Sequence, residues 1–163
     1  MTATTLVVGL GNPILGDDGV GWRVAEAVRE KLDDPAVDVL CLSLGGLALM
    51  ERLVGYRRAL IVDAMATGAP AGTLHGLDMD GMNELGIHHT ASVHDLSLAT
   101  AIALGRELGL DLPAEIRVVG VEAAPEFEFG EALSAPVGRA VPAATGAVLG
   151  WLESRDGERK TEK

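Results

Sequence analysis

Hydrophobic and polar positions along the chain form short apolar runs that alternate with segments of helical spacing. Short runs bounded by glycine or polar residues are typical of strands, and the run at residues 72–79 has the weakest pattern. The predicted strands cover residues 4–10, 37–44, 58–65, 72–79 and 115–122. Segments with apolar residues every three or four positions predict amphipathic helices. These helices cover residues 19–32, 46–55, 94–109 and 137–153.

This alternation of strands and helices predicts an α/β fold. Right-handed crossovers between parallel strands give a mostly parallel, twisted five-stranded sheet with helices on both faces. At 163 residues the chain has the length of one domain, which we place at 1–153. We expect the polar tail 154–163 to be disordered. The polar segment 80–93 is longer than a plain connector, which favours a functional loop.

Two helices carry more detailed expectations. In the helix 94–109, Leu98, Ile102 and Leu108 should face inward, with a glycine as the stop signal. In the last helix we place Pro142 close to the start, where its missing N–H costs least.

The segment GLGNPILGDDGVG (9–21) follows the first strand, and three interpretations compete for it. A dinucleotide-binding loop would need glycine where Ile14 stands, and Pro13 removes an N–H that would face a pyrophosphate. Peptidyl-tRNA hydrolases also begin with a strand and GLGNP, but they continue with a catalytic histidine. Here the first histidine is His75, and the net charge of −11 suits tRNA poorly.

The third interpretation gives the carboxylates of this loop the functional role. Ligands of an α/β sheet gather at the carboxyl ends of its strands. Asp17 is placed to cap the following helix, which leaves Asp18 to point into the crevice. Asp63 follows four apolar residues at the carboxyl end of the third predicted strand, which opens onto the same crevice, and a role in a turn is equally open for it. His94 begins the helix 94–109.

Asp18, Asp63 and His94 together would form a site with nitrogen and oxygen ligands and open positions. Such a set suits nickel, zinc or another divalent first-row metal better than calcium or magnesium. The three residues lie far apart in sequence, so their convergence is a hypothesis. Of the other histidines, His75 is expected to be packed or exposed in the fourth strand.

Composition narrows the class of protein. Hydrophobic residues make up 48% of the chain and aromatic residues 3%, so Ala, Val, Leu and Ile must build the core. The charge of −11 argues against a nucleic-acid partner. Cys41 is the only cysteine, which excludes an intrachain disulfide. With neither a signal peptide nor a membrane-length apolar segment in view, we expect a cytoplasmic protein without membrane contact.

Four motifs resemble those of the hydrogenase maturation endopeptidases. They are GLGNPILGDDGVG (9–21), VDAM (62–65), SVHDL (92–96) and VVGVEAAPEFEFGEALSAPV (118–137). The resemblance covers residues 4–150, nearly all of the predicted domain. It implies an aspartyl-type endopeptidase that removes the C-terminal extension of the nickel–iron hydrogenase large-subunit precursor after nickel insertion.

The resemblance also implies roles for individual residues. The family's metal-contacting and catalytic groups correspond to Asp18, Asp63 and His94, and many relatives carry Glu at the position of Asp18. The nickel would come with the substrate, and zinc or cadmium would substitute for it. The implied partner is the precursor. Apart from the resemblance, we expect a monomer, the simplest arrangement for an enzyme that acts on one folded substrate.

Two other functions use the same three residues. One is a zinc-dependent hydrolase of a small substrate, and the other is a nickel-binding chaperone without catalytic activity. Within the protease interpretation, the metal either activates a water molecule or only tethers the substrate. We favour the tether.

Overall fold

The structure is a computed structural model that describes residues 3–78 and 97–160, with side chains described as far as residue 154. Its elements are β1 (Thr5–Leu10), η1 (Gly16–Gly19), α1 (Val20–Lys31), β2 (Val37–Leu42), α2 (Gly46–Leu53), β3 (Arg58–Met65), β4 (Leu74–Asp78), α4 (Leu98–Glu107), β5 (Glu115–Glu122) and α5 (Ala135–Lys160). In the described part of the chain, no helix is long and apolar enough to cross a membrane.

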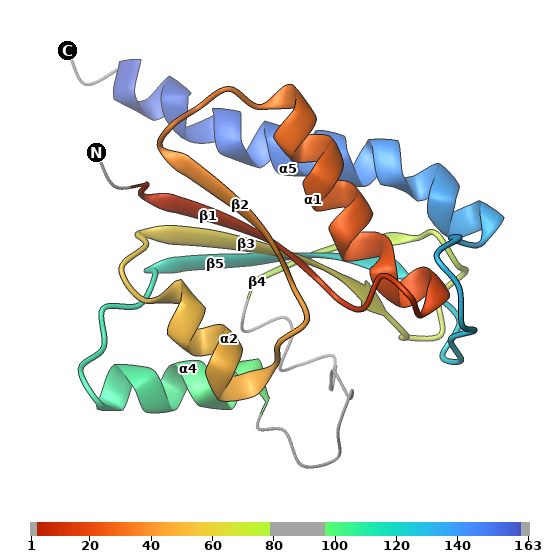
Figure 1. The fold of residues 1–163 in the computed structure, drawn as a ribbon. Helices are drawn as coiled ribbons and strands as arrows, with labels where there is room; N and C mark the ends of the chain where they lie inside the picture. The colour runs from red at the N-terminus through yellow and green to blue at the C-terminus, as the bar shows by residue number, and fades with distance from the viewer. Residues whose placement is uncertain (1–2, 79–96, 161–163) are drawn as a thin grey trace.

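The strands form one sheet in the order β2-β1-β3-β5-β4. The first four of these are parallel neighbours, and β4 pairs antiparallel with β5 at the edge (Figure 1). The predicted α/β fold with a mostly parallel five-stranded sheet is therefore confirmed. The order places β3 at the centre, with every one of its residues buried.

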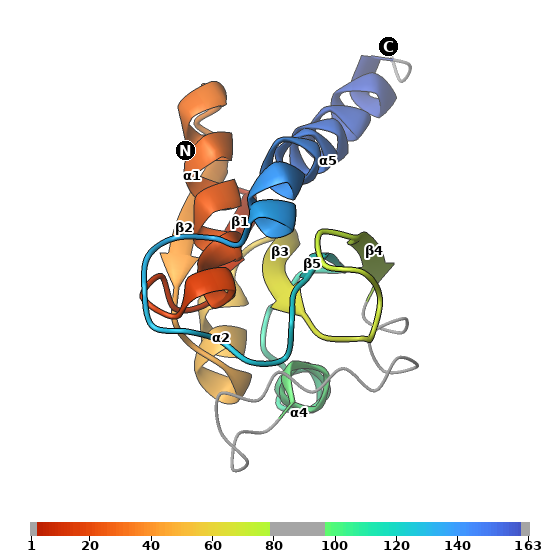
Figure 2. The same cartoon turned by 90° about the vertical axis from the view of Figure 1, so that its right-hand side faces the viewer.

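Two helices cover each face of the sheet, as Figures 1 and 2 show. On one face, α1 and α5 pack on a cluster of small aliphatic side chains that includes Val24, Val62 and Val148. On the other face, α2 and α4 pack on a second cluster that includes Leu53, Ile61 and Ile102. Because successive side chains of a strand point to opposite faces, the apolar run of β3 supplies both clusters.

Two helices, α4 and α5, differ from the prediction at their ends. Helix α4 ends at Glu107, so Leu108, expected to face inward, lies beyond it and is 68% exposed. Helix α5 begins at Ala135, which places Pro142 inside the helix. The same helix continues to Lys160, through most of the segment expected to be disordered. Once its packed part has formed, further residues extend an existing helix and do not have to nucleate a new one.

Helix α1 begins directly against the ends of the central strands because two glycines leave room for it. A Cβ at Gly9 of β1 would overlap the carbonyl oxygen of Gly21 and the methyl group of Ala25. A Cβ at Gly21 would overlap the carbonyl oxygens of Leu10 and Val62. The position of the loop between β1 and α1 therefore depends on two residues without side chains.

Gly21→Ala should destabilise the protein by more than about 2 kcal/mol, because the new methyl group meets backbone atoms that cannot move aside. Urea denaturation followed by circular dichroism measures this loss. Gly146→Ala in α5 is the matched control, since nothing lies within 4 Å of a Cβ at that position. It should stabilise the protein by about 0.5–1 kcal/mol. Equal unfolding midpoints for the two variants would contradict the close-approach explanation.

Candidate active site

Asp63 lies where the central strand extends past its neighbour. The pairing of β3 with β1 ends at Val62 and Gly9, whereas pairing with β5 continues through Asp63 and Gly120. The side chain of Asp63 is almost completely buried. Its Oδ1 accepts a hydrogen bond of 2.7 Å from the backbone amide of Ala64. This carboxyl group is therefore held near the carboxyl ends of the strands, just past the last residue pair that joins β3 to β1.

Asp18 lies in η1, a single turn between β1 and α1. Its Oδ2 accepts a hydrogen bond of 3.0 Å from the amide of Asn12, which closes the loop on itself. The backbone of Asp18 also lies against Gly11, whose φ of 139° and missing side chain permit that approach. The loop folds back so that Asp18 returns to the end of the strand that the chain has just left.

The two carboxyl groups interact electrostatically. The pKa of Asp63 is raised well above its ordinary value, first by burial and then by the negative charge of Asp18, while the Ala64 amide partly opposes the rise. The structure thus brings together two of the three residues expected to form the site. Such a pair is a receptor for a proton or a cation, because either relieves the cost of burying the negative charge.

His94, the third expected residue, lies outside the described residues, as do His88 and His89. Within the described part of the chain, no three His, Cys, Asp or Glu side chains gather closely enough to hold a metal ion. A metal bound by Asp18 and Asp63 therefore needs further ligands from His94, from a substrate or from water. The three-residue site stays a prediction.

The prediction that Asp17 caps its own helix is wrong. Helix α1 begins after Gly19 without a side-chain cap. Asp17 instead accepts hydrogen bonds from the amide (2.7 Å) and the hydroxyl (2.8 Å) of Ser134. Because the turn η1 intervenes, Asp17 stands too early to reach the first amides of α1. It links this loop to the residue just before α5.

Comparison with known proteins decides the family. The family model described as "Hydrogenase maturation protease" (HycI) matches residues 22–151, which is most of the chain. The chain belongs to the hydrogenase maturation protease family. It is therefore an enzyme of the peptidase class, as the motifs at 9–21 and 62–65 had indicated.

Individual relatives agree with this assignment. The protease is 30% identical to the hydrogenase 2 maturation protease of Escherichia coli over 118 residues, 71% of each chain. It is 27% identical to the hydrogenase expression/formation protein HupD of Thiocapsa roseopersicina, where the match covers 90% of this chain and 66% of that one. The structure of the maturating endopeptidase HybD from Escherichia coli superposes with a TM-score of 0.75 at 27% identity, covering 93% of both chains.

Glu122 of the protease ends β5 and fastens a neighbouring loop. Its buried carboxylate accepts hydrogen bonds from the amide (2.7 Å) and hydroxyl (3.0 Å) of Thr67 and from the amide of Gly68 (2.9 Å), and it pairs with Nε2 of His75 at 3.0 Å. Burial alone would raise the pKa of Glu122, but these donors outweigh it and lower the pKa. This network was not predicted, although an acid ending a buried strand was the signal that had singled out Asp63.

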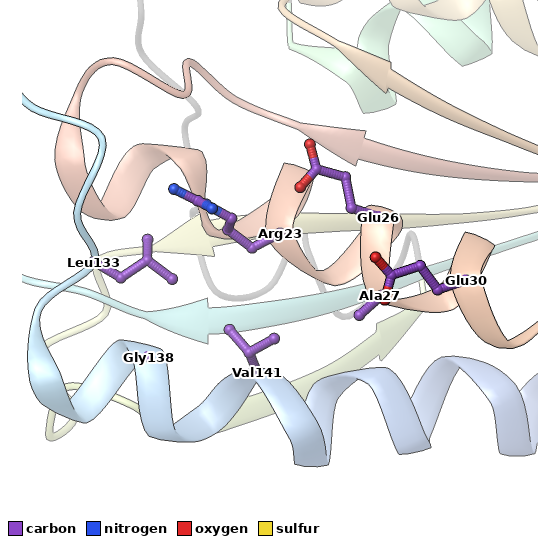
Figure 3. Close-up of a pocket in the computed structure, with 7 residues that line it drawn as sticks. All are labelled: Arg23, Glu26, Ala27, Glu30, Leu133, Gly138 and Val141. Atoms are coloured by element: carbon purple, nitrogen blue, oxygen red, sulfur yellow. The ribbon is translucent and has the colours of Figure 1, made fainter.

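A groove of about 360 Å³ lies between α1 and α5 of the protease (Figure 3). Its walls come from both helices and from Leu133 in the loop before α5, and they also include Arg23, Glu26 and Val141. Neither Asp18 nor Asp63 lines it. The carboxylate pair is therefore a feature of the sheet edge and not of this groove.

Asp63→Asn should stabilise the protease at neutral pH by roughly 0.5–2 kcal/mol, because burial and the negative charge of Asp18 disfavour the ionised carboxylate that the neutral amide replaces. A raised pKa means that the unfolded chain ionises first, so the stability of the native protein falls as pH rises above about 3.8 toward the raised pKa. The gain in stability of Asp63→Asn over wild type should therefore vanish at pH values below about 3.8. Urea denaturation at several pH values measures it, and exposed Asp33→Asn is the control, expected to change stability by less than about 0.5 kcal/mol.

Glu122→Gln should act in the opposite direction and cost roughly 2 kcal/mol at neutral pH, since an amide cannot satisfy the donors that surround this carboxylate. The lowered pKa means that the native carboxylate stabilises the fold above about 4.5, and that this stability is lost as pH falls through the lowered value. The difference between variant and wild type should narrow in acid. A difference independent of pH would assign the effect to packing alone. Glu107→Gln, at the exposed end of α4, is the matched control.

Proposed function

We propose that this protease removes the C-terminal extension of a nickel–iron hydrogenase large-subunit precursor after nickel has been inserted. Two findings support the proposal. The chain belongs to a family named for hydrogenase maturation. Its buried Asp63 lies beside Asp18 at the edge of the sheet where α/β enzymes bind their ligands. The second observation carries the assignment of the site.

In this proposal, Asp18, Asp63 and His94 complete the coordination of the nickel that the precursor already holds. Two carboxylates and an imidazole match the ligand preference of a divalent first-row metal. A cation between the two acids would also offset the cost of keeping both ionised. Nickel is thus part of the substrate, and zinc or cadmium would substitute for it. The loaded precursor would bind better than the unloaded one because only the loaded one supplies the ion.

The chemical step in this proposal is hydrolysis of one peptide bond of the docked precursor. One carboxylate accepts a proton from water while the water oxygen adds to the scissile carbonyl carbon. The C–N bond then breaks, and the proton passes to the departing amine. A carboxyl group whose pKa is raised, as in Asp63, holds that proton more readily than an ordinary aspartate and can return it to the departing amine. This is an aspartyl-type mechanism in which nickel positions the substrate.

The remaining parts of the proposal concern the setting in which the enzyme acts. We place it in the cytoplasm, acting as a monomer on one folded precursor. Neither feature enters the chemistry of the site, so each is tested separately, by fractionation of the source cells and by sedimentation.

Incubation of the wild-type protease with nickel-loaded precursor should shorten the precursor by the mass of its C-terminal extension, as measured by mass spectrometry, and unloaded precursor should stay intact. Asp18→Asn and Asp63→Asn should each slow cleavage by about 10²-fold or more, since each removes a charged group from the site. His94→Ala should do the same. Asp33→Asn should cleave at the wild-type rate.

The outcomes separate the alternatives. Cleavage of unloaded precursor at the same rate would exclude recognition of nickel. Nickel binding by the protein without any change in precursor mass would identify a chaperone. Stoichiometric zinc retained through purification, together with turnover of a small ester or amide, would favour a zinc hydrolase. Because Asp63→Asn is expected to be more stable than wild type, its loss of activity cannot be attributed to unfolding.

A further inference from the structure

The aromatic residues of this chain are distributed unusually. It contains only two phenylalanines, Phe127 and Phe129, and both lie in the loop 123–134 between β5 and α5. Phe127 is 41% exposed and Phe129 is 87% exposed. Phenylalanine is among the residues most often buried in folded proteins, so two exposed ones in a single loop need an explanation. Exposed aromatic side chains that cluster are typical of protein interfaces.

The loop that carries them is attached to the loop that carries the acids. Leu15 and Gly130 form a parallel β-bridge. The amide of Gly16 donates to the carbonyl of Gly130 (2.8 Å), and the amide of Gly130 donates to the carbonyl of Ile14 (2.9 Å). Asp17 adds its two hydrogen bonds to Ser134. Figure 2 shows the two loops running side by side below α1.

These attachments extend the apolar surface toward the carboxylate pair. Ile14 is 50% exposed and belongs to the same loop as Asp18, four residues earlier in the chain. Its carbonyl accepts a hydrogen bond from the loop of the phenylalanines, so the backbone of Ile14 joins that loop to the segment that carries Asp18. We call Ile14, Phe127 and Phe129 the apolar rim.

The charged side chains within the loop 123–134 are all negative, and Arg23 of α1 lies against this loop, where it donates a hydrogen bond of 2.8 Å to the carbonyl of Glu131. Exposed Glu126, Glu128 and Glu131 alternate with the phenylalanines in the sequence EFEFGE (126–131). A surface on which apolar side chains alternate with carboxylates complements a polypeptide that presents apolar side chains beside Lys or Arg. It repels acidic segments, including those of a second copy of this chain, whose net charge is −11.

We propose that the apolar rim and its three glutamates are the docking surface for an apolar and basic segment of the precursor, next to the bond that is cut. This inference rests on the proposed function and adds to it a second contact, independent of the metal. Substrate binding then has two parts. The carboxylates recognise the ion, and the rim recognises the polypeptide and orients it across the site. Loss of rim contacts should weaken substrate binding without altering the bond-breaking step.

The test is the double variant Phe127→Ser, Phe129→Ser, assayed on nickel-loaded precursor. We expect KM to rise at least about tenfold while kcat stays within about twofold of wild type, the pattern of lost uniform binding. Leu108→Ser, at the exposed residue after α4, is the matched control and should change neither constant. Thermal unfolding of both variants should match wild type, because the replaced side chains are exposed.

A second variant tests the charges. Changing Glu126, Glu128 and Glu131 to Gln should raise KM and flatten its dependence on salt, since screening weakens only the charged contacts. Equal KM for the double phenylalanine variant and wild type would overturn the proposal. So would a variant whose only change, by sedimentation, is loss of self-association, which would identify the rim as a contact between copies of the chain. If wild type binds the precursor through the rim but does not cleave it, the docking inference stands and the proposed function fails.

Discussion

The structure depends on one close approach, between the first turn of α1 and the ends of β1 and β3. Gly9 and Gly21 have no side chains at the point where the backbones meet, so the helix can begin directly above the central strands. This contact fixes where the loop 11–19 must turn back, and it therefore fixes Asp18. The site and the packing of α1 share one geometric requirement. A change that lifts the helix from the sheet also moves the acid.

Two buried carboxylates at the carboxyl ends of neighbouring strands have opposite environments, and this contrast supports the role proposed for Asp63. Glu122 is surrounded by donors from Thr67, Gly68 and His75, so its charge is stabilised and fastens a loop. Asp63 accepts a hydrogen bond from the amide of Ala64, but the nearby charge of Asp18 is also negative and raises the pKa of Asp63. The electrostatic environment disfavours the ionised carboxylate of Asp63 in β3, and it favours the ionised carboxylate of Glu122 in the neighbouring strand β5.

Sequence reasoning located most elements of the fold because the apolar runs are long and regular. Asp63 was found by the same logic, as an acid that closes such a run. Asp17 was assigned wrongly because a single turn of 3₁₀ helix, without any hydrophobic period, separates it from α1. The hydrogen-bond network of Glu122 was not predicted because its donors include backbone amides of a loop distant in sequence. A pattern of side chains along the sequence does not reveal such donors. The extent of α5 was missed because polar residues that continue a packed helix look like those of a free tail.

The attachment between the two loops at the site is made largely by main-chain atoms. Gly130 contributes its amide and its carbonyl, Ile14 contributes its carbonyl, and Gly16 contributes its amide. These hydrogen bonds therefore depend little on the identity of the neighbouring side chains. Residues at 127 and 129 can therefore be exchanged during evolution while the loop keeps its place. With such an arrangement, the preference for a protein partner can change between lineages while Asp18 and Asp63 keep their positions. Duplicated genes could specialise for different client proteins by altering a few exposed positions on an unchanged chemical framework.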